Sequence, residues 1–365
     1  MKRIVVFIPG IMGSKLKEPA AAGGRPLWYE HIRRAVSQLV HDPSLLRWNP
    51  GNRLDAYEVL RQVTIPFNRF FKVGICQLLS KELADMALIE QLFTYQEYAY
   101  DWRQDITETA RQLGAWFDQH GFTRKSNGKQ QKEDSPRIAL VCHSMGGLVA
   151  AIAMRRQFIN PENVYRYVTI GSPFAGAPAA FRGLYDLGYL PGMEWMERAI
   201  NWRWNRITSR RILLESLQSF ASSYQLLPPG AEDFVELAGG GTINPLNRPI
   251  IPADKRKAAK EAHANLNGLE AFLKKFPQLE YLFIFGDHQN NTDYRFRARE
   301  NAVSEVYEGV ICRNKTNGDG TVPVESATLK NRRAHFRHPV AGAAHMSMCN
   351  DPRIIQAVKG FLAKP

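Results

Sequence analysis

The amino-acid sequence predicts an α/β protein built on a mainly parallel sheet. Short apolar, β-branched runs recur along the chain, and segments with helical periodicity separate them. The runs are apolar almost throughout, as strands buried on both faces of a parallel sheet tend to be. The four clearest runs are residues 3–8, 137–142, 164–170 and 279–285.

The segments between these runs carry the apolar spacing of helices. Leu148 and Ile152 follow the second run on one helical face, and Arg155 extends that face to its rim. Two further amphipathic patterns consist of Ile106, Ala110, Leu113 and Phe117, and of Ile354, Ile355, Val358, Phe361 and Leu362. Strands that alternate with helices in this way predict parallel pairing.

We expect the whole chain, residues 1–365, to form a single α/β domain with two insertions on the open face of its sheet. The first insertion, 26–93, is membrane-like or cap-like in composition. The second, 174–277, is a predicted cap or lid. Residues 124–136 are expected to form a polar surface loop.

The charge balance favours anionic partners. Forty-eight Lys and Arg residues against 35 Asp and Glu residues give a formal charge of +13. A phospholipid surface, nucleic acid or an acidic ligand would each suit this excess. Because no nucleic-acid-binding motif is present, we expect no nucleic-acid partner. The oligomeric state is left open.

The cysteines and apolar runs limit the class of protein further. Cys76, Cys142, Cys312 and Cys349 lack the spacing of a zinc site, so we expect no zinc site. A serine mechanism of the kind described below would need neither a metal nor an organic cofactor. No run reaches the roughly 18 apolar residues of a membrane span. Residues 4–8 are interpreted as a buried strand rather than part of a cleaved signal. The expected location is the cytoplasm or a membrane surface, and export without a cleaved signal stays open.

Residues 137–150, RIALVCHSMGGLVA, have the pattern that presents a nucleophilic serine. Such a serine needs a strand before it, a tight turn, and a helix that begins directly behind it. Cys142 is small enough for the position that glycine usually takes, and Gly146 and Gly147 keep the other side open. We therefore interpret Ser144 as a nucleophile; the alternative is a buried strand that ends in an ordinary glycine turn.

A catalytic base is expected late in the chain, because α/β hydrolases present serine, acid and histidine in that order. His345 lies in a small-residue loop just before the closing helix. His335 and His338 are expected to pack or to face solvent. His143 is expected to point elsewhere on the serine turn.

Two aspartates compete for the role of triad acid. Asp319 is flanked by Gly318 and Gly320, which would let backbone N–H groups hold its carboxylate. Asp287 directly follows a buried strand, in a polar segment that we expect to be a solvated loop. We favour Asp319, in part because of the family resemblance given below. The alternative is that Asp319 only caps an ordinary Gly-Asp-Gly turn.

The oxyanion hole of such a site combines two backbone N–H groups. One usually belongs to the residue after the nucleophile, here Met145. The loop after the first strand would supply the second, from Ile11, with Gly10 allowing close approach. The alternative is a plain turn after that strand.

Residues 195–211 predict a basic amphipathic helix with tryptophans. Its apolar and basic faces suit an anionic membrane interface, or equally a cap helix over the active site. The side chains expected to face substrate or membrane are Trp195, Trp202, Trp204, Arg203, Arg206 and Arg210.

In combination, these motifs resemble the lecithin:cholesterol acyltransferase family, which includes lysosomal phospholipase A and phospholipid:diacylglycerol acyltransferases. The segments that carry the resemblance are 5–16 (VVFIPGIMGSKL), 98–105 (YAYDWRQD), 142–150 (CHSMGGLVA), 169–178 (TIGSPFAGAP), 224–228 (YQLLP), 318–323 (GDGTVP) and 342–346 (GAAHM). The family commonly has a small non-glycine residue at the position of Cys142.

The resemblance implies an α/β-hydrolase fold with cap insertions. It also implies a triad of Ser144, Asp319 and His345, with Ile11 and Met145 as oxyanion donors. The expected function is hydrolysis or transfer of acyl chains from lipid esters, including phospholipids, at a membrane surface and without a cofactor. Rival functions are a soluble carboxylesterase or thioesterase, and a catalytically inactive lipid-binding module.

Overall fold

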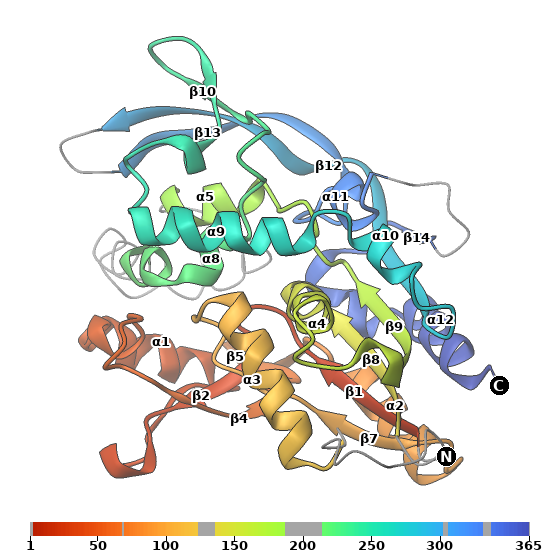
Figure 1. Cartoon of the computed structure of the whole chain (residues 1–365). Helices are drawn as coiled ribbons and strands as arrows, with labels where there is room; N and C mark the ends of the chain where they lie inside the picture. Colours follow the sequence, from red (N-terminus) through yellow and green to blue (C-terminus); the bar gives the residue numbers. More distant parts are fainter. Residues whose placement is uncertain are drawn as a thin grey trace.

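A mainly parallel sheet runs through the molecule (Figure 1). Its neighbouring strands pair in parallel in the order β7-β1-β8-β9-β12-β14. The strands are β1 (Arg3–Ile8), β7 (Thr94–Glu97), β8 (Arg137–His143), β9 (Val164–Ile170), β12 (Glu280–Asn301) and β14 (Arg337–Ala341). The structure is a computed structural model and describes residues 3–67, 69–122, 136–186, 214–301, 306–330 and 337–364.

The strand order reverses direction once, at β1. The chain goes from β1 to β7 on one side and then returns to β8 on the other. In open parallel sheets, the crevice outside the carboxyl ends of the strands at such a reversal is the usual place for a ligand. The segments after β1 and β8, which contain Gly10 and Ser144, therefore meet at this point.

Two hydrophobic cores cover the two faces of the sheet. Along β1, Val6 and Ile8 point into one core while Val5 and Phe7 point into the other. The first core is covered by α3 (Ile106–Gln119), α4 (Met145–Arg155) and α9 (Ala253–Leu266). The second is covered by α2 (Gln77–Leu88) and α12 (Pro352–Ala363). Because both faces are buried, the strands are apolar at successive positions.

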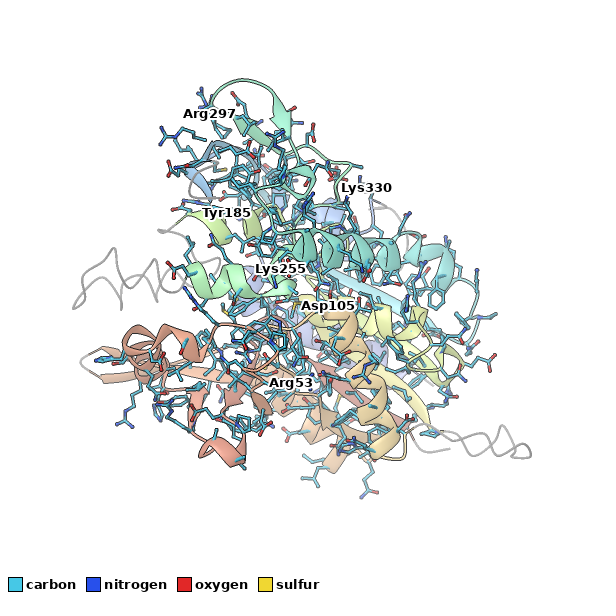
Figure 2. All side chains as sticks on the ribbon, turned by 60° about the vertical axis from the view of Figure 1, so that its left-hand side comes forward. Arg53, Asp105, Tyr185, Lys255, Arg297 and Lys330 are labelled. Carbon is cyan, nitrogen blue, oxygen red and sulfur yellow. The ribbon has the colours of Figure 1, made fainter. Side chains whose placement is uncertain are left out.

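The first core also extends into a cap above the sheet (Figure 1). The cap elements are α5 (Ala179–Tyr185), α8 (Ala221–Gln225), η5 (Pro245–Asn247), β10 (Val235–Leu237), β11 (Thr242–Ile243) and β13 (Val306–Gly318). The short helix α10 (Leu269–Leu273) lies beside the sheet, where its Glu270 pairs with Arg337 of β14. Asp105, which caps α3, lies where the cap meets the body (Figure 2). Its Oδ2 accepts a hydrogen bond from Nε2 of Gln225 at 2.9 Å, which joins α8 to α3.

A smaller layer, built from N-terminal segments, lies below the cap at the lower left of Figure 1. It contains β2 (Ser14–Lys17), η1 (Ala20–Ala22), β3 (Pro26–Trp28), α1 (Ile32–His41), η2 (Pro43–Leu45), β4 (Asp55–Val59), β5 (Gln62–Phe67) and β6 (Arg69–Gly74). β2, β3 and β4 pair as one antiparallel sheet, and β5 and β6 form a hairpin. The chain is completed by η4 (Pro161–Asn163), α11 (Val324–Ala327) and η6 (His345–Asn350).

The predicted fold class is confirmed, and all four apolar runs are strands of the sheet. The expectation of a solvated loop after residue 285 is wrong, because β12 continues to Asn301 and pairs there with β13. The predicted loop 124–136 lies outside the described residues, apart from Pro136. Among the helices that the structure describes, none has the length and apolar character needed to cross a bilayer.

Candidate active site

Ser144 stands at a sharp turn between β8 and α4. Its backbone has φ 51° and ψ −125°, a strained conformation for a residue with a Cβ atom. The glycines behind it are required by space. A Cβ atom at Gly146 would collide with the carbonyl oxygen of Ile8, and one at Gly147 would collide with Ser172. The strand, turn and helix thus have the geometry of a nucleophile elbow.

Cys142 takes the position before this turn where glycine is common. Its side chain is completely buried in the first core. Burial raises the pKa of the Cys142 thiol well above its usual value, so the side chain packs there as a small neutral group.

His345 connects Ser144 to Asp319. Its Nδ1 lies 2.7 Å from Oδ2 of Asp319, and its Nε2 lies 3.0 Å from Oγ of Ser144. A carboxylate only accepts hydrogen bonds, so the hydrogen of the neutral imidazole is on Nδ1. Nε2 then carries the lone pair and accepts from the serine hydroxyl. The residues Ser144, His345 and Asp319 are 6%, 7% and 2% exposed, respectively.

Asp319 is held in place by backbone N–H groups. Its Oδ1 accepts from the N–H groups of Thr321 and Val322, at 2.9 and 2.7 Å. The backbone oxygen of Asp319 also accepts from the N–H of His345 at 2.9 Å. The competing acid, Asp287, lies in β12, where Nδ2 of Asn317 donates to it at 3.5 Å. The structure therefore brings Asp319, and not Asp287, into hydrogen-bond contact with His345.

Two glycines that the sequence analysis did not single out make room for this pair. A Cβ atom at Gly171 would lie 2.9 Å from Oδ2 of Asp319 and 3.1 Å from Nδ1 of His345, and its φ of +61° also favours glycine. A Cβ atom at Gly286 would lie 2.6 Å from Cβ of Asp319. Each glycine directly follows a predicted strand, and this position was the only hint in the sequence that it lies near the site.

The loop after β1 turns tightly beside the serine. The N–H of Gly13 donates to the carbonyl oxygen of Gly10 at 3.1 Å, and Met12 has φ 60°. A Cβ atom at Gly10 would lie 2.8 Å from Cβ of Ser144. Ile11 therefore lies on a turn next to the nucleophile, and Met145 is the first residue of the helix behind it.

The segment YDWR braces this loop. The hydroxyl of Tyr100 donates to the carbonyl oxygen of Pro9 at 2.7 Å, and Nε1 of Trp102 donates to the carbonyl oxygen of Ser14 at 3.0 Å. Arg103 is fully buried and pairs with Asp101 at 2.6 Å. These contacts give the segment a structural role that its sequence alone did not reveal.

His143 corrects one expectation. We expected it to point elsewhere on the serine turn, but its Nε2 lies 3.1 Å from the carbonyl oxygen of His345. The two imidazole rings are 5.1 Å apart between centroids. No local sequence signal indicated this contact, because it joins residues 202 positions apart in the chain.

An apolar cavity of about 310 Å³ opens onto Ser144 and His345. The cap contributes one wall, formed by Ala177, Ala180, Leu184, Leu217 and Leu226. The N-terminal side contributes the other wall, formed by Trp28, Leu60, Val63 and Ile75. Such a cavity suits a hydrocarbon chain with a few polar groups at its reacting end.

The remaining predictions concern the basic segment 195–211, metal sites and the cysteines. Trp195, Trp202, Trp204, Arg203, Arg206 and Arg210 all lie outside the described residues. Within the described ranges, no group of three or more His, Cys, Asp or Glu side chains has the arrangement of a metal site. All four cysteines are free thiols.

Comparisons with known proteins agree with this architecture. A family model described as a PGAP1-like alpha/beta domain matches residues 85–206, which include β8, the serine turn and α4. Lecithin-cholesterol acyltransferase-like 4 of Arabidopsis thaliana is 24% identical over 310 residues. Phospholipase A(1) LCAT3 of the same plant is 20% identical over 324 residues. The chain resembles the lecithin:cholesterol acyltransferase family, as its motifs predicted.

These matches cover much of this chain and less of the relatives. Each includes 73% of this chain, but the chain spans only 54% and 65% of the two relatives, in the order given. A solved structure, "The crystal structure of Tle4-Tli4 complex", matches with a TM-score of 0.57 and 13% identity. That match covers 99% of this chain and 98% of the other, and shows the fold alone. Strand order, serine turn and comparisons together show an α/β-hydrolase fold.

Proposed function

We propose that the protein is a serine-dependent hydrolase or O-acyltransferase of lipid esters that acts through an acyl-enzyme on Ser144. The observation that carries the proposal is the hydrogen-bonded row of Ser144, His345 and Asp319 at the end of an apolar cavity. A nucleophile, its base and an orienting acid in this arrangement support acyl transfer. The names of the two plant relatives support a lipid ester as the substrate.

The proposed reaction follows from the protonation states. Nε2 of His345 takes the proton from Ser144 as its oxygen attacks the ester carbonyl. The N–H groups of Ile11 and Met145 are the proposed donors to the oxyanion, and the N-terminus of α4 favours the negative charge there. His345 then protonates the leaving alcohol or lysolipid. Water or a second alcohol releases the acyl group by the same steps in reverse.

The division of the chain and its surface partners also stay proposals. Residues 26–93 and 174–277 are proposed to enclose the acyl chain from two sides, which the two cavity walls support. The basic segment 195–211 is proposed to contact anionic lipid on a membrane surface, on its sequence pattern.

The proposal is tested by comparing wild-type protein with Ser144→Ala. Each is assayed on phospholipid vesicles, on a micellar ester and on a short monomeric ester. We expect Ser144-dependent release of fatty acid, with a preference for aggregated lipid. Turnover that survives in pure Ser144→Ala protein would overturn the serine mechanism. A strong preference for the monomeric ester would instead identify a soluble carboxylesterase.

A further inference from the structure

A second histidine lies directly beside the row of Ser144, His345 and Asp319. His143 is the last residue of β8, one position before Ser144, and is only 6% exposed. Its Nε2 lies 3.1 Å from the carbonyl oxygen of His345. Because a carbonyl oxygen only accepts, the hydrogen of His143 must be on Nε2. His143 is therefore a donor, and its hydrogen bond is to the main chain of the base, beside the packing of the two rings.

The charge state of His143 suits this role. Burial, and then the charge of the nearby His345, lower the pKa of His143 to about 3; the hydrogen bond to the backbone of His345 and then Asp319 raise it by smaller amounts. His143 therefore stays neutral at every pH at which an imidazole base works. This matters because His345 becomes an imidazolium during acyl transfer, and a second cation 5.1 Å away would oppose that charge.

The main chain of His345 is held from two sides. Its N–H donates to the backbone oxygen of Asp319, and its carbonyl accepts from His143. The first contact ties the base to the loop that carries the acid. The second ties it to the strand that delivers Ser144. The hydrogen bond from His143 therefore links the loop of His345 to the strand of Ser144. It helps to set the distance between Nε2 of His345 and Oγ of Ser144.

We propose that His143 is a positioning residue, which fixes the loop of His345 against the strand of Ser144 through one buried hydrogen bond. The proposal rests on the proposed function, since it assigns His143 to the same acyl-transfer site. It differs from a general role in packing because it requires the donor group and not merely the bulk of the ring.

Two substitutions separate the donor from the bulk. His143→Leu fills similar space without a donor, and His143→Gln keeps an N–H group of comparable reach. Loss of the hydrogen bond leaves a buried carbonyl without this partner, and small displacements of reacting groups are costly. We expect His143→Leu to lower kcat by about 10- to 100-fold with KM little changed. His143→Gln should restore kcat to within about fivefold of wild type.

A double substitution tests whether His143 acts through His345. In Asp319→Asn protein the base is no longer productive, so adding His143→Leu should cost much less than it does alone. Thermal unfolding of each variant shows whether it is folded, and any unfolded variant is replaced by His143→Met. Two losses that multiply in full, or a His143→Gln variant as impaired as His143→Leu, would overturn the positioning role.

The pH profile gives an independent readout. Because His143 is neutral throughout, the acid limb of kcat in His143→Gln should keep the wild-type midpoint. An upward shift of about half a unit or more would mean that His143 carries charge in that range, and would overturn the proposal. Wild-type and Ser144→Ala proteins are assayed alongside. Equal activity of those two would refute the proposed function itself, whereas Ser144-dependent turnover with a fully active His143→Leu refutes only this inference.

Discussion

Replacing the carboxylate of Asp319 by an amide should disable the base without moving it. Oδ1 of Asp319 accepts two backbone N–H groups, from Thr321 and Val322. In Asp319→Asn the amide oxygen must keep these contacts, because an NH₂ group there would face two donors. The NH₂ group is then directed at Nδ1 of His345, in place of the Oδ2 atom that now lies 2.7 Å away.

The magnitude follows from the tautomer. An NH₂ group donates to Nδ1, so the imidazole hydrogen moves to Nε2. That nitrogen then has no lone pair with which to accept the proton of Ser144. In a serine protease triad the same change lowers turnover by roughly 10⁴-fold, and we expect a similar loss here. At about 1.4 kcal/mol for each factor of ten, this is about 5 kcal/mol of transition-state stabilisation.

The assay is kcat on a short monomeric ester, with Asp287→Asn as the matched control. Asp287 is the other aspartate that the sequence offered as the acid. It lies in β12, and its carboxylate accepts a hydrogen bond from Asn317 at 3.5 Å rather than from His345. We expect the control to stay within a few-fold of wild type. An Asp319→Asn protein within tenfold of wild type, or a control that loses 10³-fold, would refute the assignment of the acid.

Three further predictions follow from packing and charge. Gly10→Ala should slow acylation about 10- to 100-fold, because its Cβ atom would lie 2.8 Å from Cβ of Ser144; Gly360→Ala, with no atom nearby, should leave stopped-flow acylation unchanged. Arg103→Met should lower the free energy of unfolding in urea by about 3 to 5 kcal/mol, because it leaves Asp101 buried and unpaired; the exposed pair of Arg111 and Glu108 should matter little in Arg111→Met, and equal losses would contradict this. Replacing Arg203, Arg206 and Arg210 by glutamine should weaken binding to anionic vesicles, measured by co-sedimentation, by about 1 kcal/mol per residue, while activity on a short ester is retained. Unchanged binding would mean that the segment does not contact the membrane and acts only as a cap.

The sequence was most informative where the physics is local. Strands buried on both faces must be apolar at successive positions, and that signal predicted β1, β8 and β9. The turn at Ser144 needs only its own strand, its glycines and the following helix. Edge strand β7 escaped notice because its residues are half-buried and mostly polar.

Features that depend on contacts between residues far apart in the sequence could not be predicted. The contact of His143 with His345 joins residues 202 positions apart. The need for glycine at Gly171 and Gly286 arises only once Asp319 is placed against them. β12 continues beyond Asp287 because it pairs there with β13. In this part of β12 exposed polar side chains alternate with the buried Phe296 and Ala298, so it lacks the continuous apolar run that predicted the other strands.

Covalent labelling tests the central claim most directly. Folded wild-type protein is treated with a fluorophosphonate, and the modified peptide is located by mass spectrometry. A serine activated by His345 should carry one adduct, on the peptide that contains Ser144, and His345→Ala should slow its formation by several orders of magnitude. Labelling at another residue, or no labelling of Ser144 in a preparation that hydrolyses esters, would contradict the proposed mechanism.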